Sequence, residues 1–191
     1  MKNRWTIYQL IGSGTIGALG AVLSMLGAII STAVGILGAG GLFNAIFMGM
    51  MFSFCCITIR KFGSATIAGL VLSICLLPFP SLGTPGFFPK ILIGLSAGFM
   101  CDITFFFFNK NNKLFSIIVG AEQSILITLE IIGLGLLLSI PGIDKTADLF
   151  FNRYKFLFLI FLFMGAIGGY IGYLLYSRLR STNIMKKLGG Y

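Results

Sequence analysis

Three acidic side chains inside apolar stretches are the residues of this sequence most able to do chemistry. The chain has 191 residues and only five Asp and Glu in total, and Asp102, Glu122 and Glu130 all fall within long apolar runs. A carboxyl group is costly to bury in such a run, so it usually marks a ligand, an ion pathway or an internal partner. These three carboxyl groups are therefore the first candidates for functional residues.

Glu130 is the candidate ligand contact because of its depth. It lies about 24 Å along a helix from the inner end of its apolar run, in the outer half of a bilayer. Gln123 shares its helical face, which is polar over an arc of about 100°. Asn44 can complete an outer pocket from the second apolar run. The predicted substrate-binding residues are Glu130, Gln123, Asn44, Phe87 and Lys90.

Asp102 and Glu122 form a second acidic group, nearer the inner side. Asp102 lies about 9 Å and Glu122 about 12 Å from the inner ends of their predicted helices. Because these depths are similar, the two carboxyl groups can face each other and share a proton. We expect an intramembrane acidic pair or an interhelical hydrogen bond, with a structural role.

The remaining residue types argue against an enzyme. The sequence contains no histidine, which excludes haem ligation and acid-base catalysis through His, and most zinc sites. The four cysteines lack metal-ligand spacing and are predicted to be buried structural thiols; they are Cys55, Cys56, Cys75 and Cys101. Only one Asp lies in an apolar run, whereas an aspartyl intramembrane protease needs two. We therefore expect no catalytic residue, no metal and no cofactor.

These residues are predicted to lie on transmembrane helices. Hydrophobic residues make up 57% of the chain and charged residues 10%, so lipid must be its main solvent. A spanning helix needs about 20 residues, which predicts one all-α transmembrane domain over 1–191 with six helices. The predicted spans are 7–31, 42–59, 62–77, 88–108, 114–140 and 155–176. The third is short for a span.

Lys and Arg predict the orientation of the spans. The net charge is +9, but the basic residues form small clusters at the ends of apolar runs rather than a continuous face for nucleic acid. Ten of them fall on the side of the N-terminus and four on the other. Because cytoplasmic loops are richer in Lys and Arg, we expect a multi-pass protein of the plasma membrane with both termini in the cytoplasm.

The first span carries small residues at four-residue spacing, namely Ser13, Gly17 and Ala21. Small residues at this spacing line one helix face and let another backbone approach closely. The partner helix can belong to the same chain, which is packing within the bundle. It can also belong to a separate membrane protein, in which case the stripe is a docking surface.

Three segments carry a resemblance to a known family. They are Arg-Lys-Phe-Gly-Ser-Ala at 60–65, Gly-Thr-Pro-Gly-Phe-Phe at 83–88 and Gly-Leu-Ser-Ala-Gly-Phe-Met-Cys-Asp at 94–102. With six spans and internal termini, they resemble the substrate-binding S component of energy-coupling factor transporters, in particular the hydroxymethylpyrimidine and thiamine branch. The family's usual Ala-x-x-x-Ala docking pair is absent, so Ser13, Gly17 and Ala21 would replace it.

The resemblance implies a substrate-binding subunit without catalysis of its own, for a vitamin or related micronutrient. It implies a membrane coupling protein and two ATPase subunits as partners. The ligand would bind from outside, among the fourth to sixth helices and under the loop joining the first two. A small ion-coupled or proton-coupled carrier or channel is the alternative, and a purely structural membrane subunit is a third. A carrier would work without ATPases, and a structural subunit would bind no small molecule.

Overall fold

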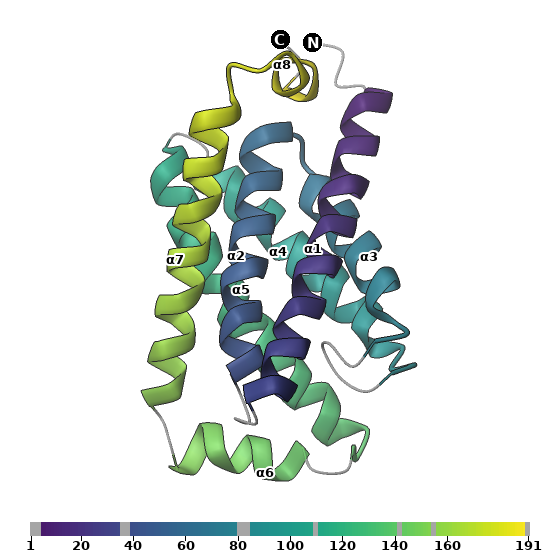
Figure 1. Cartoon of the computed structure of the whole chain (residues 1–191), viewed down its shortest axis with the longest axis vertical. Helices are drawn as coiled ribbons and strands as arrows, with labels where there is room; N and C mark the ends of the chain where they lie inside the picture. The colour runs from purple at the N-terminus through teal and green to yellow at the C-terminus, as the bar shows by residue number, and fades with distance from the viewer. Residues whose placement is uncertain are drawn as a thin grey trace.

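The structure is a computed structural model that describes residues 5–34, 39–79, 85–108, 111–140, 143–153 and 156–189. All regular elements among these residues are helices (Figure 1). In chain order they are α1 (Ile7–Val34), α2 (Ala39–Ile59), α3 (Ser64–Leu76), α4 (Pro89–Phe108), α5 (Asn112–Leu137), α6 (Ile143–Asp148), the π-helical η1 (Leu149–Arg153), α7 (Phe156–Leu179) and α8 (Asn183–Gly189).

Five of these helices are long and apolar enough to cross a membrane, namely α1, α2, α4, α5 and α7. The predicted all-helical, multi-pass architecture is confirmed to that extent. The third predicted span corresponds to α3, which has only 13 residues and would extend about 20 Å. Because α3 is shorter than a bilayer core, its ends need polar partners inside the protein.

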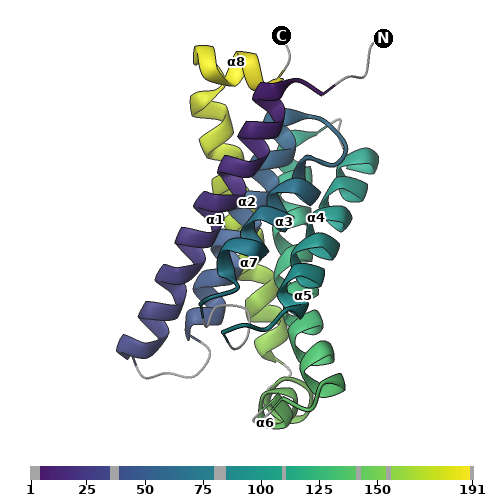
Figure 2. The ribbon, with the colours of Figure 1, turned by 90° about the vertical axis from the view of Figure 1, so that its right-hand side faces the viewer.

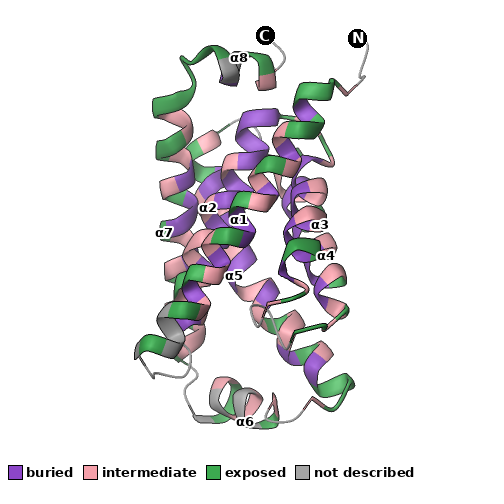
Figure 3. Cartoon of the chain, turned by 45° about the vertical axis from the view of Figure 1, so that its right-hand side comes forward, coloured by how far each residue is buried: buried purple, intermediate pink, exposed green. Residues whose placement is uncertain are grey.

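The helices form one bundle in which α2 is central. It packs against α1, α5 and α7, while α3 is held between α1 and α4. Figure 2 shows the same arrangement from the side. The main core contains Phe52 from α2, Leu72 from α3 and Phe115 from α5. Burial is concentrated on the faces that the helices turn toward each other (Figure 3).

Small residues set the closest helix contacts. A Cβ atom added to Gly69 of α3 would overlap the backbone of Gly94 on α4, and the reverse also holds. Gly120 of α5 and Gly165 of α7 have the same relation. Close backbone contact of this kind substitutes for the hydrophobic effect, which lipid cannot supply between helices.

The small-residue stripe of α1 packs inside the bundle. Ser13 and Ala21 are buried, and a Cβ atom on Gly17 would overlap the carbonyl group of Ala68 in α3. Of the two interpretations open from the sequence, the structure corresponds to internal packing. The face assigned to partner docking is covered by α3, because a helix as short as α3 needs a close neighbour on each side.

The lipid-facing surface of the bundle is apolar. Phe106, Phe107 and Phe108 at the end of α4 are exposed, as expected for lipid-facing residues, whereas Phe105 packs edge-on against Phe115. Three cysteines are buried as predicted, but Cys75 is exposed. Cys75 departs from the prediction because α3 turns one face away from its neighbours.

Two short helices that were not predicted from the sequence lie across the ends of the bundle. Helix α8 crosses the end where α1 begins, and α6 crosses the other end (Figure 1). Helix α8 is fixed to α1 because the Leu188 side chain sits over Gly12 and the Gln9 amide donates to the Leu188 carbonyl over 3.3 Å.

Candidate functional site

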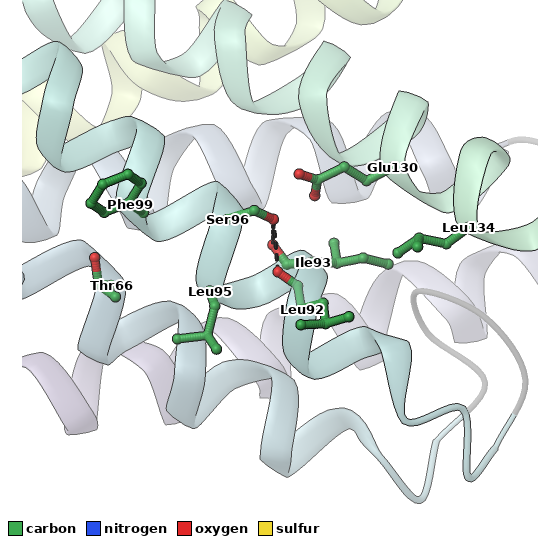
Figure 4. Close-up of a pocket in the computed structure, with 8 residues that line it drawn as sticks. All are labelled: Thr66, Leu92, Ile93, Leu95, Ser96, Phe99, Glu130 and Leu134. Atoms are coloured by element: carbon green, nitrogen blue, oxygen red, sulfur yellow. Dashed lines mark hydrogen bonds between the residues drawn. The ribbon is translucent and has the colours of Figure 1, made fainter.

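A groove of about 570 Å³ lies along α4 between α3 and α5. Figure 4 shows the side chains that form it. Its lining residues are Thr66 from α3, Leu92, Ile93, Leu95, Ser96 and Phe99 from α4, and Glu130 and Leu134 from α5. The surface is almost wholly apolar, with three polar side chains set into it.

Glu130 is the ionisable group of this lining. Its carboxylate points from α5 toward α4 (Figure 4). The Oε2 atom is buried and accepts no hydrogen bond from the described residues. A buried carboxylate oxygen without a donor is unfavourable, because it has lost its water without replacement. The site therefore has an open place for a hydrogen-bond donor.

The two hydroxyl groups of the lining differ in their partners. Thr66 donates to Asp102 Oδ2 at 2.7 Å, so its oxygen is left as an acceptor. The Ser96 hydroxyl can donate its one hydrogen to the carbonyl oxygen of Leu92 at 2.7 Å, to that of Ile93 at 3.0 Å, or to the neighbouring Glu130 side chain. None of the lining residues is cationic. The charge that the groove presents to a ligand is therefore that of the Glu130 carboxylate.

Asp102 is outside the groove and caps the start of α3. Its Oδ1 accepts from the backbone N–H of Ala65 at 3.2 Å and its Oδ2 from that of Thr66 at 3.0 Å. These N–H groups belong to the first turn of a helix and have no partner within it. A carboxylate there also complements the positive end of the helix dipole.

Lys90 caps the other end of the same helix. Its side chain is fully buried, and Nζ donates to the carbonyl oxygens of Leu76 at 3.1 Å and Phe79 at 2.5 Å. These carbonyls end α3 and its following turn, where a positive charge is favourable. The structure thus places Lys90 in a structural contact outside the groove, whereas a substrate contact was predicted for it from the sequence.

Glu122 has a different partner from Asp102. It accepts a hydrogen bond from Thr104 Oγ1 at 2.6 Å, which joins α5 to α4. Asp102 and Glu122 each make an interhelical hydrogen bond, one of the two structural roles expected from the sequence. Among the described hydrogen bonds, none joins the two carboxyl groups to each other.

The other predicted ligand residues lie outside the groove lining. Gln123 is buried, and its amide donates to the Ala97 carbonyl at 2.9 Å. Asn44 is placed against α1, where a Cβ atom on Gly27 would meet its Oδ1. Phe87 packs against the main core. Of the five residues predicted to bind substrate, only Glu130 lines this groove.

Ser96 and Thr66 were not predicted as site residues from the sequence. Ser96 lies six residues from Asp102 on the same helix. A hydroxyl group gives no hydropathy signal in an apolar run, so only the packing of α4 against α5 could reveal its position. Thr66 follows the glycine turn at Gly63, whose backbone has φ of 94°.

No family model, curated protein or solved structure matches this chain. The described residues contain no group of three or more Cys, Asp or Glu side chains that could hold a metal ion. The groove takes its walls from α3, α4 and α5, whereas the resemblance places a ligand among the fourth to sixth spans. The loop expected to cover that ligand includes residues 35–38, which lie outside the described residues.

Proposed function

We propose that this protein is the substrate-binding subunit of a transporter for a small organic molecule with a cationic or hydrogen-bond-donating group. The observation that carries the proposal is the buried Oε2 of Glu130, which has no donor among the described residues. In an apolar groove, a carboxylate attracts a positive charge much more strongly than it does in water. The binding site would then consist of Glu130, Ser96, Thr66 and the apolar side chains around them.

The proposed topology has six spans, with α3 as the short third one and both termini in the cytoplasm of a plasma-membrane protein. The exposed basic side chains of Arg60, Arg178, Arg180 and Lys187 support this orientation, since Lys and Arg are enriched on the cytoplasmic side. Helix α8 and the start of α1 share one end of the bundle (Figure 1), which fits an even number of crossings.

The proposed assembly is an energy-coupling factor transporter, in which this chain would be the S component. The membrane coupling protein and two ATPases would supply the energy. Its support is the sequence resemblance together with the absence of any soluble domain among the described helices. Because the Ser13, Gly17 and Ala21 face is covered by α3, a coupling protein would have to contact another face of α1, which is apolar at Ile11, Leu19 and Val22.

Ligand binding to the purified full chain in detergent tests the proposal. Thiamine, hydroxymethylpyrimidine and other B vitamins form the first panel, and thermal shift with native mass spectrometry gives the readout. We expect one compound to stabilise the protein saturably and Glu130→Gln to weaken its binding about tenfold or more, equivalent to 1.4 kcal/mol. Glu122→Gln is the matched control, since Glu122 is bonded to Thr104 outside the groove.

Two results would contradict the proposal. If no cationic or donor-bearing compound binds in a Glu130-dependent way, the groove is not a substrate site. If the chain alone moves protons or cations across liposomes with an ion gradient, it is a carrier instead of a binding subunit. ATP-dependent uptake that requires co-expressed ATPases would support the transporter assembly.

A further inference from the structure

The polar groups of the groove favour a ligand that carries positive charge and donates hydrogen bonds. Glu130 can only accept while ionised, and Thr66 donates its hydroxyl hydrogen to Asp102. A carboxylate or phosphate group would meet the negative charge of Glu130 in a lining that contains no Lys or Arg. An ammonium or amidinium group with N–H bonds would satisfy Oε2 of Glu130 and can also reach a hydroxyl oxygen.

The groove opens sideways from the bundle. Leu92 and Phe99 line it and are 59% and 48% exposed. They lie seven residues apart on α4, which places them on one helix face. Phe106, seven residues further along α4, continues that face and is exposed as well. In a membrane this face meets lipid chains, so the groove is open to the bilayer.

Glu130 on α5 and Ser96 on α4 lie at similar distances from the ends of their helices. Glu130 is seven residues from the end of α5 at Leu137, and Ser96 is seven residues from the start of α4 at Pro89. Both distances correspond to about 10 Å along a helix, each measured from the helix end that is nearer to α6 (Figure 2). A long amphiphile lying in that leaflet can place a cationic head at this depth.

We infer that the ligand of this groove is an amphiphilic organic cation with N–H donors, which reaches Glu130 sideways from the lipid. This inference rests on the proposed function and specifies its substrate class and route. The apolar part of the ligand occupies the surface formed by Leu92, Leu95, Phe99 and Leu134, which are the leucine and phenylalanine side chains of the lining. The nitrogen lies between Glu130 and Ser96.

A set of simple amines tests the ligand class. The full chain in phosphatidylcholine nanodiscs is titrated with decylammonium, decyltrimethylammonium, butylammonium and decyl sulfate, with concentrations corrected for partition into lipid. We expect decylammonium to bind saturably and about tenfold or more tighter than each of the others. Glu130→Gln should remove that preference, and Glu122→Gln should leave it unchanged.

A spin label tests the route without any ligand. Phe99→Cys in a Cys75→Ala background carries a nitroxide at the groove, and its relaxation is compared for oxygen, which concentrates in lipid, and a water-soluble nickel chelate. We expect oxygen to dominate. A nickel-dominated response would overturn access from the lipid.

The outcomes separate this inference from the proposed function. If thiamine or another water-soluble cation binds through Glu130 but decylammonium does not, the inference is wrong and the proposed function stands. If decyltrimethylammonium binds as tightly as decylammonium, the N–H requirement is wrong. If none of these cations depends on Glu130, both proposals fail together.

Discussion

The three intramembrane carboxyl groups differ in the hydrogen-bond donors that surround them. Asp102 accepts from the α3 backbone and Glu122 from Thr104. Glu130 alone of the three keeps a buried oxygen that accepts no hydrogen bond from the described residues. A carboxylate with donors stabilises the fold, whereas one without a donor represents a cost that a ligand can remove.

At the residue scale, we predict that Thr104→Val destabilises the protein by about 1–3 kcal/mol, because it leaves Glu122 without its donor. Replacing both partners, as Thr104→Val with Glu122→Leu, should recover most of that loss. Thermal unfolding of the four proteins in a double-mutant cycle gives the measurement. If the loss of stability in the double variant equals the sum of the two single losses, the 2.6 Å contact contributes nothing to stability.

Helix α3 depends on a neighbour for both of its ends. One helix, α4, supplies Asp102 to the first turn and Lys90 to the last carbonyls. These residues are 12 positions apart and so about 18 Å apart along α4, close to the length of α3. Because α4 runs antiparallel to α3, each charge meets the end of the helix dipole that it complements.

At the element scale, we predict that Asp102→Ala and Lys90→Met each destabilise the protein by about 2–4 kcal/mol, since they leave buried backbone groups unpaired. Hydrogen exchange should also accelerate at the Ala65 and Thr66 amides in Asp102→Ala. Arg180→Met, at an exposed position, is the control and should change stability little. Unchanged exchange at these amides would show that Asp102 does not cap α3.

The contact between α3 and α4 gives a second prediction at this scale. Gly94→Ala should destabilise the protein by about 1–3 kcal/mol, because the added Cβ would overlap Gly69 and Ser73. Gly133→Ala is the matched control: it lies in α5 with nothing within 4 Å of its added Cβ, so the better helix propensity of Ala should make it neutral or stabilising. Unfolding midpoints in detergent compare the two, and equal effects would contradict this account of the α3–α4 contact.

At the scale of the whole molecule, the two ends of the bundle differ in charge. Arg60, Arg178, Arg180 and Lys187 belong to the end with α8, while α6 and η1 at the other end carry Lys145 and Arg153 beside Asp144 and Asp148. An excess of Lys and Arg on one side is what sets orientation during insertion. The groove lies nearer the α6 end, which faces outward in the proposed topology.

We predict that this polarity determines the membrane topology. In a Cys75→Ala background, Ser181→Cys should react with a membrane-impermeant maleimide only after the cytoplasmic side is opened, and Asp144→Cys should react in intact cells. Both positions are exposed. The buried native thiols Cys55, Cys56 and Cys101 should give little background. Labelling of Ser181→Cys in intact cells would reverse the proposed orientation.

The class of protein and the position of its long helices follow from the amino-acid pattern alone. Runs of 20 or more apolar residues leave helix as the only structure that satisfies the backbone in lipid, so five spans were predictable to within a few residues. Glu130 was also identifiable, because an isolated carboxyl group at that depth stands out from its apolar surroundings.

The contacts of each polar residue depend on how the helices pack, which the amino-acid pattern does not reveal. Lys90 and Gln123 are predicted from the sequence to bind substrate, but their partners are backbone carbonyl groups on other helices. Ser96 and Thr66 join Glu130 only because α3, α4 and α5 meet at one groove. Hydropathy reports the cost of burying a polar group, whereas the partner that offsets this cost depends on which helix faces meet, and that is set by packing across the whole bundle.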